Sequence, residues 1–154
     1  MTVRVQTQDF DAGLELTQLR LARKDVGAVV SFIGQVRDVN EGDTVSQLSL
    51  EHYPGMTEKA LAAIVAQAQS RWDIFDTLII HRVGTLQPLD QIVLVAVSGA
   101  HRGEAFKACE FIMDALKTEA PFWKKEVTAS GERWLEAKES DDVARKRWIK
   151  PAHQ

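Results

Sequence analysis

The sequence predicts an α+β fold in a single domain, with a largely antiparallel mixed sheet and packed helices. Short strand-like segments follow one another across tight turns, which favours antiparallel pairing, and the segments with helical periodicity stand apart from them. The chain has 154 residues, of which 45% are hydrophobic and 27% charged, and this size suits one ordinary core. We therefore expect residues 1–154 to form one domain.

The N-terminal third is expected to hold three strands and a short helix. Thr2 to Gln6 alternates like an edge strand, and Leu14 to Lys24 has the pattern of a helix. Gly27 to Val36 is a β-branched run that is typical of a buried strand. Val45 to Tyr53 alternates as its expected neighbour, because the residues between them favour a turn.

The middle of the chain predicts a helix and two further strands. Thr57 is expected to cap a helix that runs to about Trp72, and the helix carries one apolar stripe, formed by Leu61, Ile64, Val65, Ala68 and Trp72. Leu78 to Arg82 and Gln91 to Ser98 are strands on either side of the turn sequence GTLQPLD. The second of these strands is apolar throughout, which indicates burial on both faces.

The C-terminal part predicts a long helix and two short strands. The helix runs from about Gly103 to Thr118, and at helical spacing it is expected to bury Phe106, Cys109, Ile112 or Met113, and Leu116. Strand-like segments follow at Trp123 to Thr128 and Arg133 to Glu136, before a closing segment of mixed charge.

Composition excludes several classes of protein. A net charge of -3 and a pI near 5.8 argue against a general nucleic-acid or membrane-surface binder, so any basic site is local. No stretch approaches the roughly 20 apolar residues of a membrane span, and the N-terminus has no apolar signal core, which predicts a cytoplasmic protein. One cysteine, Cys109, excludes an internal disulfide and a cysteine-rich metal site. We expect neither a metal nor a cofactor.

The most informative segment is LKTEAPFWKKE, from Leu116 to Glu126. Pro121 ends the preceding helix and pushes Ala120 out of the α region, so Lys117 and Lys124 should lie on either side of a sharp reversal. Two ammonium groups could then face one pocket, and close like charges lower the proton affinity of a lysine that serves as nucleophile or base. The alternative is a solvated cationic helix end that complements the helix dipole.

A second group of cations suits an anionic ligand. Arg37 ends a predicted strand, while His101 and Arg102 begin the helix that carries Lys117 near its other end. Strand ends and helix N-termini are places where cationic side chains and backbone donors meet a phosphate or carboxylate. Because this helix spans about 20 Å, Arg102 and Lys117 of one chain are not expected to share a small pocket, although they could meet across a dimer.

Five segments together resemble the MoaE family, the catalytic large subunits of molybdopterin synthase: GAVVSFIGQVRD, LSLEHYPGMTEKAL, HRVGTLQPLDQIVLVAVSGAHR, FIMDALKTEAPFWKKE and RWLEAKESD. The resemblance implies an α/β hammerhead-like fold and an enzyme that converts cyclic pyranopterin monophosphate (precursor Z) to molybdopterin. The sulfur is then expected from the C-terminal Gly-Gly thiocarboxylate of a small ubiquitin-like carrier subunit. The resemblance further implies a homodimer that forms a heterotetramer with two carriers.

The resemblance also implies roles for individual residues. Lys117 and Lys124 match the two active-site lysines, and acid and base are not assigned between them. Arg37, His101 and Arg102 match the set that binds the substrate phosphate, with the His-Arg pair from the other subunit. Further candidates that flank these positions or line the channel for the carrier tail are Gln35, Val36, Lys125, Glu126, Phe32 and Met113. Lys138 stands where some relatives have arginine, so a phosphate contact there would lack the bidentate fork.

Other reactive side chains have simpler interpretations. Cys109 falls on an apolar helix face and is expected to be a core thiol, and His52 and His81 are expected to be structural histidines. The alternative function is a non-catalytic module that binds a ubiquitin-like tail or a phosphorylated metabolite, and such a module would not need both lysines. A single-stranded nucleic-acid binder would need a broad basic stripe, which the sequence lacks.

Overall fold

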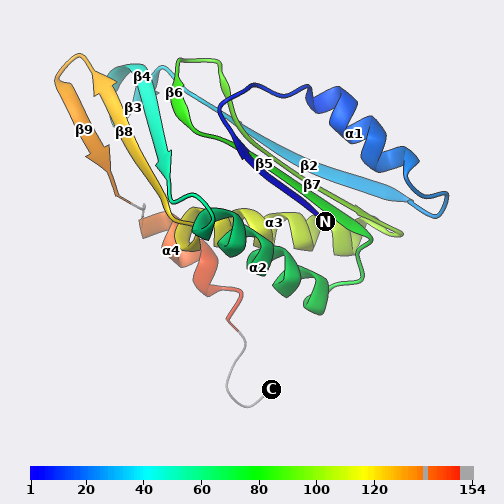
Figure 1. Ribbon diagram of the computed structural model, residues 1–154. Helices are drawn as coiled ribbons and strands as arrows, with labels where there is room; N and C mark the ends of the chain where they lie inside the picture. The colour runs from blue at the N-terminus through cyan, green and yellow to red at the C-terminus, as the bar shows by residue number, and fades with distance from the viewer. Residues whose placement is uncertain (137–138, 150–154) are drawn as a thin grey trace.

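The computed structural model describes residues 1–136 and 139–149, which form two sheets and the helices that cover them (Figure 1). The first sheet has the strand order β1-β5-β7-β2. Its members are β1 (Thr2–Gln6), β5 (Asp76–Arg82), β7 (Gln91–Gly99) and β2 (Ala28–Gln35). β1 is parallel to β5, and the other two pairs are antiparallel. The predicted α+β class with a largely antiparallel mixed sheet is confirmed.

The second sheet is built around β4 (Asp43–His52), which pairs with β8 (Phe122–Thr128) and with the short β6 (Gly84–Leu86). β3 (Val39–Asn40) and β9 (Gly131–Leu135) flank them. The prediction that GTLQPLD forms only a turn is wrong, because its first three residues form β6. Leu86 of this strand is 1% exposed because it packs into the small apolar cluster between the sheets.

The helices lie on both faces of the first sheet (Figure 1). α1 (Ala12–Leu21) covers one face, whereas α2 (Met56–Arg71) and α3 (Arg102–Glu119) cover the other. α4 (Glu139–Lys146) packs against α3. Central strand β7 is buried on both faces, as predicted: Val95 faces α2 and α3, while Leu94 faces α1. None of the helices in the described ranges is long and apolar enough to cross a membrane.

The burial and pairing predicted for Gly27 to Val36 are wrong, although the strand itself forms. β2 lies at the edge of the first sheet, and Phe32 and Ile33 are 41% and 42% exposed. Its partner is β7, and the predicted neighbour, β4, belongs to the second sheet. Only the first half of β2 packs against the helices. The β-branched run therefore forms an edge strand of the sheet rather than a central strand.

Two smaller predictions also need correction. Thr57 does not cap α2, because Gly55 is the N-cap. The backbone N–H of Gly55 donates a hydrogen bond to the Glu58 carboxylate. The Thr57 hydroxyl instead donates to the Pro121 carbonyl oxygen at 3.1 Å, which ties α2 to the start of β8. Phe106 is 59% exposed, because the buried face of α3 is centred away from it, on Ala105, Ala108 and Ile112.

Candidate functional site

The lysine-bearing turn forms as the sequence predicts. Lys117 lies in the last turn of α3, and Ala120 is extended, with φ -81 and ψ 134. The chain then reverses into β8, whose third residue is Lys124. Pro121 cannot continue the helix and restricts the residue before it, so the reversal follows from the local sequence. Lys117 is exposed and Lys124 is half-buried.

Beside this turn lies a buried histidine, His81 of β5, which is 2% exposed. Its ring stacks on Phe122, with the ring centroids 3.8 Å apart and an interplanar angle of 18°. Its Nδ1 is 2.8 Å from the carbonyl oxygen of Arg82. The sequence interpretation of His81 as a structural histidine identified neither of these contacts.

The charges of both lysines reach this ring. Burial is the main cause that lowers the pKa of His81 to about 3, and the charges of Lys124, Lys117 and His52 lower it further, while the hydrogen bond to Arg82 opposes the shift. These charges belong to residues of α3, β8 and β4, and the stacking of Phe122 on His81 places the start of β8 at the end of β5. The ring is neutral at neutral pH.

The neutral state of His81 predicts a pH dependence of stability. The folded-state pKa of about 3 lies below the unfolded value, so between these values the unfolded chain binds the extra proton. Stability is therefore fully present above about pH 6.5 and falls as the pH drops towards 3. Between pH 7 and pH 5 this one group should cost about 2 kcal/mol. Urea unfolding of the parent and of His81→Gln at both pH values measures it, and an equal pH response of the two proteins would contradict the assignment.

Strand alternation separates the other candidates on β8. Lys124 and Glu126 share a face, opposite Leu50 and Leu48 of β4. Lys125 therefore points to the other face, where its Nζ lies 3.6 Å from Glu132 and 5.5 Å from the centroid of the Trp134 ring. The structure does not bring the side chain of Lys125 together with the lysine pair.

Glu126 belongs to a buried polar network. It is 5% exposed and accepts hydrogen bonds from Asn40 Nδ2 at 2.9 Å and from Arg133 Nε at 3.2 Å. Arg133 also donates to Asp43 and to the Asn40 carbonyl oxygen. The hydrogen bonds of this network link the β3–β4 hairpin to β8 and β9. Asn40 and Arg133 could not be predicted as partners of Glu126, because the sequence around Glu126 does not indicate which distant residues will contact it.

Arg37 lies just beyond the C-terminal end of β2, at an exposed position. Together with neighbouring residues it lines a surface hollow, whose other members are Gln35, Val36, Asp38, Val39, Pro88 and Leu89. Strands β2 and β5 both run antiparallel to β7, so their C-terminal ends lie at the same end of the first sheet. The C-terminus of α3 lies towards that end as well (Figure 1). Arg37 and the lysine pair are therefore at one end of the molecule.

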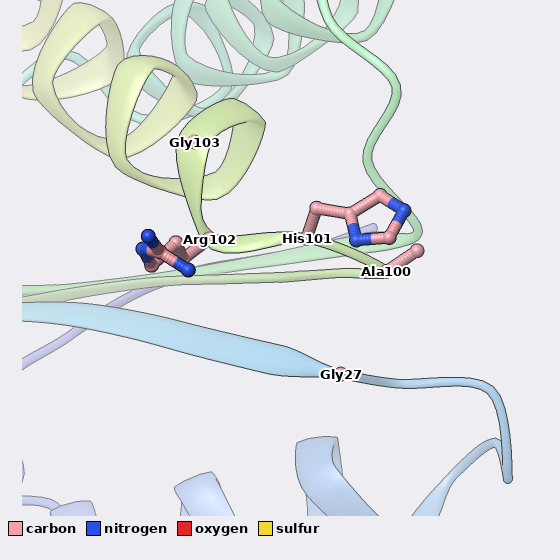
Figure 2. Close-up of a pocket in the computed structure, with 5 residues that line it drawn as sticks. All are labelled: Gly27, Ala100, His101, Arg102 and Gly103. Atoms are coloured by element: carbon pink, nitrogen blue, oxygen red, sulfur yellow. The ribbon is translucent and has the colours of Figure 1, made fainter.

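His101 and Arg102 lie at the opposite end of α3 (Figure 2). They are exposed, and with Gly27, Ala100 and Gly103 they line a second hollow. Their side chains project in different directions from the start of the helix. At about 1.5 Å rise per residue, Arg102 is about 22 Å along the helix from Lys117. A single chain thus does not bring the two groups of predicted residues together.

Close packing at Gly27 shapes the hollow next to His101, and it predicts the effect of a substitution. A Cβ atom on Gly27 would lie 2.1 Å from the carbonyl oxygen of Ala100, so Gly27→Ala must displace backbone. We expect a loss of about 1–3 kcal/mol in the free energy of unfolding, as for overpacking. Gly103→Ala is the matched control, because a Cβ there meets nothing within 4 Å. Equal urea midpoints for the two variants would contradict this account.

The remaining candidates divide between surface and core. Phe32 is exposed on β2, whereas Met113 is 8% exposed and packs in the main core cluster. Cys109 is also in this cluster, as predicted, and burial raises its pKa to about 11. Lys138 lies outside the described residues. Within the described ranges, no cluster of three or more His, Cys, Asp or Glu side chains could hold a metal ion.

Comparisons with known proteins identify the family. The family model described as MoaE protein matches residues 5–119. A molybdopterin synthase catalytic subunit from Ralstonia nicotianae is 65% identical over 147 residues, which cover 96% of this chain and 84% of the relative.

Solved structures give the same result. A molybdopterin biosynthesis MoaE protein from Burkholderia ambifaria has 56% identity and a TM-score of 0.82, with coverage of 96% of this chain and 97% of that chain. A molybdopterin synthase from Staphylococcus aureus has 34% identity and a TM-score of 0.80, with coverage of 86% and 96%. This chain therefore belongs to the MoaE family.

Proposed function

We propose that this chain acts as a molybdopterin synthase catalytic subunit in molybdenum cofactor biosynthesis. In this proposal it converts cyclic pyranopterin monophosphate to molybdopterin with sulfur from the C-terminal thiocarboxylate of a small ubiquitin-like carrier. The observation that carries the proposal is the turn that the sequence LKTEAPFWKKE forms, which places Lys117 in the last turn of α3 and Lys124 at the start of β8, next to the Phe122 ring that stacks on the buried His81. A module that only bound the tail would not need this pair.

The lysines supply the chemistry that sulfur transfer requires. Their ammonium forms stabilise the oxyanions that develop when a thiocarboxylate reacts, and an amine form accepts a proton during thiol transfer and water loss. The two positions differ in environment, since Lys117 is exposed and Lys124 is half-buried. The exposed lysine suits contact with an incoming carrier terminus.

The phosphate-binding cations are proposed to come from two subunits. Arg37 lies at the lysine end of the chain, whereas His101 and Arg102 lie at the far end of α3, about 22 Å from Lys117 along the helix. A homodimer that places the α3 N-terminus of one subunit beside the lysine turn of the other completes the site. Two such sites would take two carriers and form a cytoplasmic heterotetramer.

Product formation tests the activity directly. The purified chain is incubated with cyclic pyranopterin monophosphate and a carrier that ends in a Gly-Gly thiocarboxylate, and the dithiolene product is measured. We expect product only when the thiocarboxylate is present. Binding of substrate and carrier without product, under conditions where a related synthase is active, would favour the non-catalytic alternative.

For Arg37→Ala and Arg102→Ala we expect weaker substrate binding with carrier binding retained. Removing a charge-assisted phosphate contact costs on the order of 1.5–3 kcal/mol. Both arginines are exposed, so the fold should tolerate the change. Calorimetry with substrate and carrier separately measures the two affinities, and equal weakening of both would contradict the phosphate assignment.

A further inference from the structure

We propose that Thr57 is a positioning residue for the lysine-bearing turn, because its hydroxyl group holds the peptide unit between Pro121 and Phe122. The inference rests on the proposed function and deepens it, since it names a residue that sets the position of Lys117 relative to Lys124. Thr57 lies in the first turn of α2 and is 0% exposed, so it is not expected to touch the substrate.

The hydroxyl group of Thr57 connects two segments of the chain. The backbone N–H of Tyr53 donates to Oγ1 at 3.0 Å, and Oγ1 donates to the carbonyl oxygen of Pro121 at 3.1 Å. An amide N–H can only donate and a carbonyl oxygen can only accept, so a hydroxyl group is suited to bridge them. The backbone N–H of Thr57 also donates to the Tyr53 carbonyl oxygen at 2.9 Å. These contacts link Thr57 both to the end of β4 and to the turn.

The proline of the turn explains why a side chain is needed at this place. β4 pairs with β8 as far as His52 and Phe122, so Tyr53 and Pro121 are next in the register. Pro121 has no N–H and cannot donate a ladder hydrogen bond to Tyr53. Thr57 supplies the connection between the two segments instead. The residue that ends α3 therefore also interrupts the sheet, and the Thr57 hydroxyl bridges the interruption.

The peptide unit that Thr57 holds lies between the two lysines. The Pro121 carbonyl and the Phe122 N–H belong to this one unit, and that N–H donates to the carbonyl oxygen of Ala120 at 2.9 Å. Lys117 lies four residues before Pro121, and Lys124 lies two residues after Phe122. A planar peptide unit bonded at both polar atoms keeps one orientation, which fixes the directions in which the chain enters and leaves it. The hydroxyl group thus acts on both lysines through the backbone.

Two substitutions separate the hydroxyl group from packing. Thr57→Val keeps the shape of the side chain but replaces the hydroxyl with a methyl group, which leaves two backbone groups without this partner. Thr57→Ser keeps the hydroxyl group and loses only the methyl group. If Thr57→Val does not fold, Thr57→Ala is compared with Thr57→Ser, because both lack the methyl group and only serine has the hydroxyl.

Thr128→Val is the matched control. The Thr128 hydroxyl makes the same kind of bridge at the other end of β8, where it donates to the Gly131 carbonyl oxygen at 2.9 Å and accepts from the Ser130 N–H at 3.1 Å. Thr128 is 8% exposed, so its substitution also removes two hydrogen bonds from a buried hydroxyl group. The control therefore measures the loss of such a bridge away from the lysines.

The proposal predicts that turnover follows the hydroxyl group. We expect kcat to fall about tenfold or more in Thr57→Val, since small displacements of catalytic groups are costly, with KM for cyclic pyranopterin monophosphate little changed. Most of kcat should return in Thr57→Ser, and Thr128→Val should keep the parental value. Urea unfolding first establishes that each variant is folded. A folded Thr57→Val with parental kcat, or a Thr57→Ser no better than Thr57→Val, would overturn the proposal.

NMR tests the positioning role without activity. The amide signal of Phe122 reports on the hydrogen bond to the Pro121 carbonyl, because both groups belong to one peptide unit, and the side-chain carbon signals of Lys117 and Lys124 report on their surroundings. We expect all three signals to move in Thr57→Val, to return towards the parent in Thr57→Ser and to stay in Thr128→Val. Lysine signals that Thr57→Val leaves unmoved would refute the role even if the enzyme proves active. The expected signals would support it even if the proposed reaction fails.

Discussion

Lys117→Ala is expected to abolish nearly all product formation, with a fall in kcat on the order of 100-fold or more. The lysine lies in the last turn of α3, where its charge reaches the buried His81 beside Lys124. It is exposed, so its truncation should leave the core and the free energy of unfolding almost unchanged. A single-turnover assay with thiocarboxylated carrier and saturating substrate measures the effect on the transfer itself.

Lys107→Ala provides the control for Lys117→Ala. Lys107 is an exposed lysine on the same helix, near the end that is remote from the turn. It should keep parental turnover, which separates the loss of a particular ammonium group from a general change in charge. Parental turnover of Lys117→Ala itself would exclude the proposed role.

Mixing two inactive variants is expected to restore activity. If each site combines Lys117 of one subunit with Arg102 of the other, a heterodimer of Lys117→Ala and Arg102→Ala collects both defects in one site. Its second site keeps both residues intact. Random reassortment of a two-fold dimer after denaturation and refolding should then leave about a quarter of all sites intact, well above either parent.

The mixture distinguishes shared sites from sites within one chain. In the second case every site retains one defect, and refolding together rescues nothing. Mass spectrometry of intact dimers verifies that heterodimers form, and a refolded mixture of each variant with itself controls for losses during refolding. Verified heterodimers without recovered activity would contradict the shared site and would leave the enzyme assignment standing.

The part of the site that depends on local chemistry could be predicted from the sequence. Pro121 ends α3 and fixes Ala120 in an extended conformation, so the placement of Lys117 and Lys124 on either side of a reversal follows from a few neighbouring residues. The separation of Arg102 from Lys117 likewise follows from the number of residues between them, because both lie on one helix. Both results depend on backbone rules that act within a few residues or along one helix.

The part that depends on strand order could not be predicted. The β-branched composition of β2 suits a central or an edge strand, and the long-range contacts that place it beside β7 leave no local trace. Phe106 has helical spacing with Cys109, yet the centre of the buried face of α3 depends on which side of the helix packs against the sheet. Apolar periodicity predicts that a helix or strand forms, whereas the elements that pack against it determine which of its residues are exposed.

The same limit hid the surroundings of the two lysines. His81 lies on β5 and Phe122 on β8, and only the tertiary fold stacks their rings. Glu126 is a candidate in the sequence because of its place beside Lys125, whereas its buried contacts are with Asn40 and Arg133. A lone histidine in a strand gives no indication in the sequence of the charges that will face it.

The most direct test of the central claim follows the sulfur atom. The chain is mixed with cyclic pyranopterin monophosphate and a carrier whose C-terminal thiocarboxylate contains heavy sulfur, and product and carrier are analysed by mass spectrometry. We predict that both dithiolene sulfurs of the product carry the label, that the carrier is recovered as the carboxylate, and that Lys117→Ala yields almost no labelled product. Unlabelled product, or a thiocarboxylate that remains intact while a related synthase consumes it under the same conditions, would contradict the account.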